Sequence, residues 1–311
     1  MVERFVAVFV LAGLVALGAG CDRSANGTTM GTAGRAGDTP ARAGQPSDDA
    51  RGPERAAGIG DDVPRGEELE PGGNSGLDED RVPVVLVFSK TAGFRHASIP
   101  AGIAAVEAIG AERGFGVVAS EDAGLFTDQG LAGFDAVVFL STTGDILNGD
   151  QQAAFERFIA GGKGFVGIHA AADTEYDWAW YGELVGAYFQ SHPQVQQATV
   201  EIEDPQHPST FTLPSSWVRR DEWYDYRTNP RENERIRVLA TLLESSYTGG
   251  QMGADHPIAW CQSFGGGWAW YTGGGHTTEA FGEPEFREHL AGGILWVLSG
   301  GQPATDDAPL R

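Results

Sequence analysis

A short apolar run in the middle of the chain ends at a histidine. Residues 165–168 read Phe-Val-Gly-Ile and lead directly into His169, three alanines and Asp173. Such a run is typical of a buried parallel strand. Ligands bind at the carboxyl ends of strands in open α/β sheets, and several enzyme families place a nucleophile on the turn there. We therefore expect His169 at the tip of a tight turn, where an imidazole can exchange protons near neutral pH.

Polar residues also follow the other apolar runs of the first half. Lys90, Arg95 and His96 come after residues 82–88, and a polar segment follows residues 136–140. By the strand-end rule these loops share one crevice. Lys90 and Arg95 are then candidates to bind substrate, and His96 can join His169 in acid–base work. Alternatively, His96 is a loop histidine bonded to backbone.

Asp173 lies four residues beyond His169 and could orient its imidazole, as carboxylates do for catalytic histidines. It could equally cap the next helix, and both roles are compatible.

Residues 221–226 place acids among aromatic side chains. Sugars bind to such surfaces by stacking on rings and bonding their hydroxyls to carboxylates, so Glu222 is a candidate acid or ligand and Trp223 and Tyr224 a candidate stacking wall. The alternative is a strand edge with a solvated face.

Three glycines at 273–275 precede His276. Glycine lets backbone approach a ligand closely, so Gly274 is a candidate binding residue and His276 would face the crevice. A plain glycine turn is the competing interpretation. His192-Pro193 and His256-Pro257 are interpreted as local turn features, and His207 and His289 as surface residues.

A divalent metal is possible but weakly indicated. His-Glu-x-x-His spacing is absent, so any ligands would be a scattered set: His96, His169, Asp173, Glu222 and His276. No Gly-x-Ser-x-Gly motif occurs, which disfavours a standard serine hydrolase. No phosphate-binding glycine loop follows a strand, so nucleotide binding is unsupported.

Alternating strand and helix patterns must position these residues. A strand at 82–88 precedes a helix with Ser98 as N-cap and Pro100 near its start, and Asn148 can cap a helix over 149–160. This alternation predicts an α/β fold, a flavodoxin-like three-layer sandwich with a mostly parallel central sheet and an embellished second half. Further expected elements are strands at 117–119, 136–140, 165–168, 195–202, 236–243, 258–264 and 268–272, and a helix at 284–298.

The first 21 residues have the layout of a signal peptide, with Arg4, an apolar stretch and small residues before Cys21. We expect a bacterial lipoprotein that is lipidated at Cys21, exported and membrane-anchored, on the periplasmic side or the cell surface; an ordinary cleaved signal is the alternative. Residues 22–80 contain no Phe, Trp or Tyr and are expected to form a disordered tether. The expected domain covers 81–301, followed by a tail at 302–311, and Cys261 is expected to be a buried inert thiol.

The formal charge of −22 argues against nucleic acid as a partner, because phosphate binding needs a Lys/Arg surface.

Six segments together resemble the ThuA-like family, named for trehalose utilisation. They lie at 91–98, 164–173, 180–182, 221–224, 256–260 and 271–277. The resemblance implies a class I glutamine-amidotransferase-like fold, found beside enzymes that make or cleave 3-keto sugars. A glutamine amidotransferase is excluded because His169 stands where that chemistry needs cysteine.

Three hypotheses remain open. The first is an exported enzyme acting on a sugar or keto-sugar by isomerisation, elimination or hydrolysis, with His169 as base or acid, Asp173 orienting it, and His96, Glu222 and His276 completing the site. The second is a non-catalytic surface lipoprotein that binds a sugar or a partner. The third is a metal-dependent hydrolase. The expected partners are a small carbohydrate and, through Cys21, a membrane; the oligomeric state is open.

Overall fold

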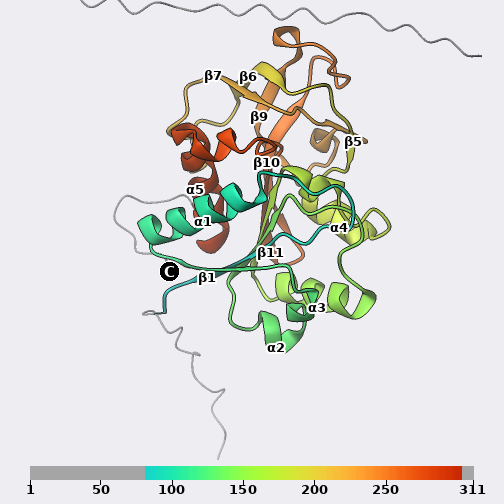
Figure 1. Ribbon diagram of the computed structural model, residues 1–311, viewed down its shortest axis with the longest axis vertical. Helices are drawn as coiled ribbons and strands as arrows, with labels where there is room; N and C mark the ends of the chain where they lie inside the picture. The colour runs from blue at the N-terminus through green and yellow to red at the C-terminus, as the bar shows by residue number, and fades with distance from the viewer. Residues whose placement is uncertain (1–80, 303–311) are drawn as a thin grey trace, which may run out of the picture. The chain divides into compact units, whose positions relative to one another are not determined.

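A nine-stranded sheet runs through residues 81–302, which the computed structural model describes (Figure 1). Its strand order is β2-β1-β3-β4-β11-β10-β9-β6-β7. The expected signal peptide, the lipidation of Cys21, the tether and most of the expected C-terminal tail lie outside the described residues.

The first half supplies four parallel strands and confirms the expected alternation. Each strand is a short run of mostly apolar residues, and β3 and β4 are buried throughout. The elements are β1 (Val84–Phe88), α1 (Ile99–Arg113), β2 (Gly116–Ser120), α2 (Asp128–Leu131), β3 (Ala136–Leu140), α3 (Gly149–Ala160) and β4 (Gly164–Ile168), with a 3-10 turn η1 (Ala123–Leu125).

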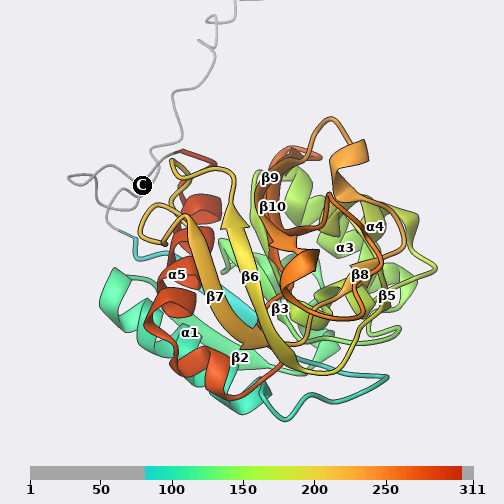
Figure 2. The ribbon, with the colours of Figure 1, turned by 90° about the horizontal axis from the view of Figure 1, so that it is seen from above.

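The second half completes the parallel core and then extends it. The strand β11 (Gly267–Thr272) pairs parallel with β4, so the order 2-1-3-4-11 is flavodoxin-like. Beyond it every pairing is antiparallel (Figure 2). The extension consists of β10 (Pro257–Phe264), β9 (Arg237–Leu243), β6 (Gln196–Ile202) and β7 (Ser216–Asp221).

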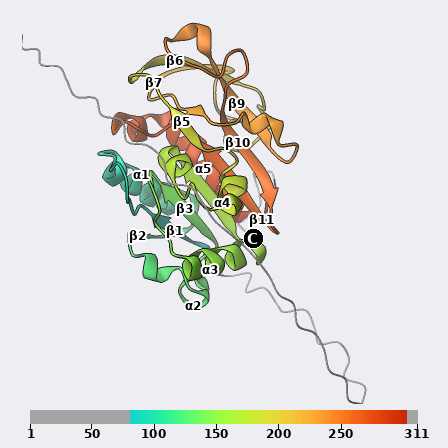
Figure 3. The same ribbon diagram turned by 90° about the vertical axis from the view of Figure 1, so that its right-hand side faces the viewer.

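Helices cover both faces of the parallel strands. The long helix α5 (Pro284–Leu298) packs beside α1 on one face, and α3 and α4 (Ala179–Val185) lie on the other (Figures 1 and 3). The remaining elements are short: β5 (Phe189–Ser191) pairs with β8 (Asp225–Tyr226), and 3-10 turns form at η2 (His169–Asp173), η3 (Pro230–Glu232), η4 (Glu244–Ser246) and η5 (Glu279–Gly282). The predicted three-layer α/β fold is thereby confirmed.

The two predicted helix caps differ in outcome. Asn148 forms a full capping box with Gln151, as its position predicted. Ser98 does precede α1, but its side chain does not cap the helix. Its hydroxyl donates instead to the carbonyl of Gly275 at 3.0 Å, which ties the start of α1 to the glycine turn after β11.

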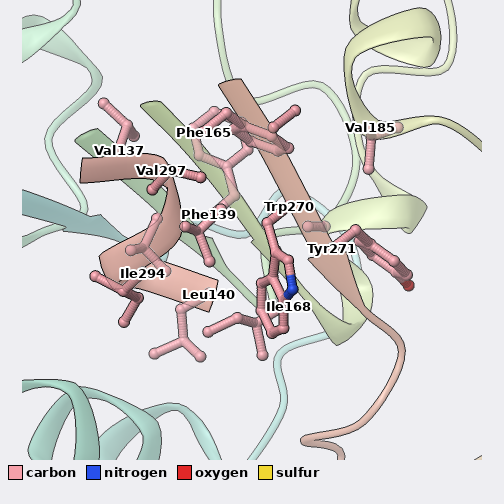
Figure 4. Packing of buried hydrophobic residues seen from close by; sticks show 14 of the residues in the cluster. Val137, Phe139, Leu140, Phe165, Ile168, Val185, Trp270, Tyr271, Ile294 and Val297 are labelled. Atoms are coloured by element: carbon pink, nitrogen blue, oxygen red, sulfur yellow. The ribbon is translucent and has the colours of Figure 1, made fainter. Parts of the chain in front are cut away.

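The core joins α5 to the parallel strands. Ile294 and Val297 of α5 lie near Val137 and Leu140 of β3, with Trp270 of β11 beside them (Figure 4). Cys261 is buried in β10, and burial raises the pKa of its thiol to about 12, consistent with the expected inert role.

Candidate active site

His169 occupies a strained turn at the end of β4. Its φ is 51°, in the left-handed region that non-glycine residues seldom adopt, and its side chain is fully buried. Its Nδ1 lies 2.9 Å from the carbonyl oxygen of Gly273, and the hydroxyl of Tyr271 donates to its own carbonyl. A carbonyl only accepts hydrogen bonds, so the proton of a neutral His169 is on Nδ1, and Nε2 presents an unshared electron pair.

Three other predicted residues converge on that Nε2. We call His96, His169, Glu222 and His276 the His–Glu cluster. His169 Nε2 lies 3.2 Å from His276 Nδ1 and 3.5 Å from Glu222 Oε2, and the last two atoms are 3.1 Å apart. The His96 ring packs edge-on against both His169 and His276, with centroids at 4.8 and 5.1 Å.

The cluster perturbs the protonation of its members. Burial raises the pKa of Glu222, but contacts with His169 and His276 outweigh it and hold that pKa at about 2. Burial lowers the pKa of His276, but the Glu222 carboxylate outweighs this and raises it. Burial, reinforced by the neighbouring histidines, lowers the pKa of His96 to about 3. At neutral pH, Glu222 is therefore ionised, His96 is neutral, and a proton on His276 is stabilised.

Asp221 holds the two loops that carry Glu222 and His276. Its buried carboxylate accepts hydrogen bonds from the backbone N–H groups of Glu222, Gly275 and His276, at 3.0, 2.8 and 3.1 Å. Arg219 lies 3.0 Å from Asp221 and is also buried, although this pair lacks the alignment of a hydrogen bond. Asp221 at the end of β7 is thus a positioning residue that the sequence analysis did not single out.

Asp173 does not bond to His169. Its carboxylate accepts a 2.5 Å hydrogen bond from Tyr176, whereas the His169 ring is held by Gly273. Asp173 thus lies next to the cluster without making the expected orienting contact.

The candidate substrate-binding residues fall in three environments. Trp223 and Tyr224 are both buried: Trp223 contacts Arg219, and Tyr224 lies against the His169 ring at 4.3 Å, so neither offers an exposed stacking face. At Gly274, an added Cβ would meet Arg219 at 2.5 Å, so this glycine accommodates protein rather than an open ligand site. Lys90 donates to the carbonyl of Ile146, and Arg95 pairs with Glu121 at an exposed edge.

Two histidines assigned to turns make side-chain contacts. His192 is exposed, but its Nδ1 lies 3.0 Å from Glu222 Oε1, so the second oxygen of that carboxylate also faces an imidazole. His256 is buried and contacts Glu244 at 2.9 Å and the carbonyl of Tyr224 at 2.8 Å. A histidine followed by proline resembles any loop, so the sequence carried no signal for either contact.

The expectation that His207 and His289 are surface residues is wrong. Both are buried, and burial lowers the pKa of each to about 3. His289 lies on α5 between Ser209 and Thr272, and His207 contacts Ser209. Histidine is polar, so its type alone did not indicate a position facing the core, although His289 lies among the buried residues of α5.

Within residues 81–302, two groups of residues have ligating atoms close enough to hold a metal ion. One is the His–Glu cluster, whose ligating atoms lie within 4.8 Å of one another. The other is Asp225, Glu244 and His256. The second group is already saturated: backbone N–H groups of Gln251 and Met252 donate to its carboxylates, and both nitrogens of His256 have protein partners.

The strand order and the strained residue after β4 define a flavodoxin-like α/β protein in which a histidine stands on the turn at the end of a parallel strand. The model of the ThuA family, described as trehalose utilisation, matches residues 84–297, and the chain belongs to this family. No curated protein matches the chain.

Two solved structures support the fold. A ThuA-like protein from Bacteroides uniformis superposes with a TM-score of 0.61 at 24% identity, covering 74% of this chain and 96% of the other. A ThuA-like protein from Parabacteroides merdae gives 0.60 at 21% identity, covering 74% and 95%. Within residues 81–302, no helix has the length and apolar character needed to cross a membrane.

Proposed function

We propose that this protein is an enzyme that acts on a sugar or a keto-sugar at the His–Glu cluster. The observation that carries the proposal is the convergence of His169, Glu222 and His276 within 3.5 Å at the strand end where related folds place a nucleophile. The family description, trehalose utilisation, supports a carbohydrate as the substrate class.

Exposure divides the roles within the cluster. The His276 side chain is 23% exposed, whereas those of His169 and Glu222 are 0% and 7% exposed. We therefore place His276 at the substrate as the proton carrier: its imidazole takes a proton from the carbon beside a keto group and returns it to a sugar oxygen, which leads to isomerisation or elimination. His169 Nε2 and the Glu222 carboxylate lie behind it, against its Nδ1, and stabilise the charged imidazole while it holds that proton. Neither outcome needs a covalent nucleophile.

Turnover tests this assignment. The protein is incubated with disaccharides and their 3-keto forms, and products are followed by NMR for wild type, Glu222→Gln and His276→Ala. We expect product with wild type and at least ~100-fold slower turnover in both variants, the scale of lost acid–base catalysis. Glu244→Gln is the matched control and keeps its activity. Undiminished turnover in Glu222→Gln and His276→Ala contradicts the proposal, and binding without turnover supports the sugar-binding lipoprotein instead.

We further propose that the enzyme is exported and anchored through a lipid on Cys21. The support is the signal-like sequence before this residue. The test is fractionation of cells expressing wild type and Cys21→Ser. The wild type should sediment with membranes and the variant should not. Equal amounts of wild type and variant in the membrane fraction would overturn the proposed anchor.

A further inference from the structure

We propose that His169, His276 and Glu222 bind a divalent transition-metal ion, with zinc as the representative probe. The ligand atoms are His169 Nε2, His276 Nδ1 and Glu222 Oε2. This inference deepens the proposed function and rests on it only for the location of the site: a bound ion would replace the proton between these atoms and would itself polarise a sugar oxygen. It is argued from geometry and is tested without any sugar.

The distances among the three atoms match a metal site. They form a triangle with edges of 3.1, 3.2 and 3.5 Å. Zinc bonds to nitrogen and oxygen are about 2.0–2.1 Å long, so two ligands of a tetrahedral zinc are about 3.3 Å apart. Two histidines and one carboxylate with an open position are a recurrent donor set of catalytic zinc, and of iron in related geometry.

The three atoms all turn electron pairs toward the centre of the triangle when the imidazoles are neutral. His169 Nδ1 lies against the Gly273 carbonyl, so a neutral His169 carries its proton there and directs the electron pair of Nε2 at Glu222 Oε2 and His276 Nδ1. A cation at the centre would satisfy all three atoms at once.

The surroundings of His169 are those of a metal ligand. Ligating histidines usually donate their other ring N–H to a carbonyl or carboxylate, which fixes the tautomer and the ring plane. The Gly273 carbonyl does this at 2.9 Å, and Tyr224 covers the ring at 4.3 Å.

His96 provides an independent observation. It is only 4% exposed, a nitrogen of its ring lies within 4.8 Å of the other three ligating atoms, and its Nδ1 has no hydrogen-bond partner in the described part of the chain. Buried polar atoms of native proteins are normally paired, so an unpaired nitrogen on a ring that belongs to this cluster points to a missing ligand.

Zinc titration of the purified full chain tests the proposal. Isothermal calorimetry should show one tight site in wild type and at least ~100-fold weaker binding in Glu222→Gln and His276→Ala, since each removes one of three ligands. Magnesium should bind far more weakly, because it prefers oxygen ligands. Thermal unfolding is measured for each variant to check that it is folded. Glu222 and His276 are chosen because replacing the fully buried His169 would disturb the fold more.

The matched control is Glu244→Gln, which changes the carboxylate of the other His–carboxylate group. It should bind zinc as wild type does. The proposal is overturned if wild type binds no zinc. It is also overturned if Glu222→Gln keeps zinc binding while Glu244→Gln loses it. Sugar turnover that persists in metal-free protein leaves the proposed function standing even if the zinc site fails.

Discussion

At the scale of single residues, Asp221 joins the parts of the site. One buried carboxylate accepts hydrogen bonds from the loop after β7 and from the turn after β11, and it lies beside the buried guanidinium of Arg219. Glu222 and His276 belong to those two segments, so Asp221 supports their 3.1 Å contact through the backbone.

We predict that Asp221→Asn destabilises the protein by about 3 kcal/mol, because removing one partner leaves a buried charge poorly compensated. Zinc affinity and turnover should fall with it. The control is Glu283→Gln, which removes the other, partly exposed partner of Arg219 and should cost less. Denaturant unfolding measures both; equal stability of Asp221→Asn and wild type would sink the argument.

The sequence singled out the four residues that the structure brings together in the His–Glu cluster, but not the residues that support them. His96, His169, Glu222 and His276 could be found because each follows an apolar run or lies among aromatics, and strand ends meet at one edge of a sheet. His192 could not, because its contact with Glu222 depends on how a long loop folds back. Trp223 follows Glu222 in the chain, but its ring points into the core toward Arg219. The residues around Trp223 in the sequence do not indicate this direction.

At the scale of elements, α5 packs closely on β11, the strand that leads into the glycine turn before His276. A Cβ added at Gly293 would lie 2.4 Å from the Trp270 ring, closer than atoms can approach. Trp270 belongs to β11, two residues before the strand ends at Thr272.

We predict that Gly293→Ala destabilises the protein by about 1–3 kcal/mol, the usual cost of overpacking, although alanine ordinarily favours a helix. Gly149→Ala in α3 is the matched control, since its added Cβ meets nothing within 4 Å, and it should be neutral or mildly stabilising. Thermal unfolding compares the two variants. If Gly293→Ala is as stable as Gly149→Ala, α5 does not pack as described.

Elements with apolar runs were predictable, and those with buried charge were not. Five elements lie at or within two residues of their expected limits: the strands β1, β3 and β4 and the helices α3 and α5. Their buried positions carry apolar side chains, so the sequence shows which residues face the core. The strand β7 was missed: it alternates exposed and buried residues, but two of the buried ones are Arg219 and Asp221. Their polarity hides the period of the strand.

At the scale of the whole molecule, buried neutral histidines tie stability to pH. Burial lowers the pKa of His207 and His289 to about 3, from an ordinary value of 6.5. Between those values the unfolded chain binds protons that the folded chain does not. The free energy of unfolding therefore decreases as the pH falls.

We predict that the free energy of unfolding decreases as the pH is lowered from 7 to 5, by up to about 1.4 kcal/mol per pH unit for each such histidine. Urea unfolding at several pH values measures the slope. His289→Gln should have a shallower slope than wild type over this range. A free energy that rises on acidification would show that these histidines are not held neutral.

The most direct test of the central claim, that the His–Glu cluster is the substrate site, is thermal unfolding with disaccharides and their 3-keto forms. The account predicts that at least one sugar raises the melting temperature of wild type and of Glu244→Gln, and that the rise is lost in Glu222→Gln. A rise of the same size in Glu222→Gln would place the sugar elsewhere on the molecule and contradict the account.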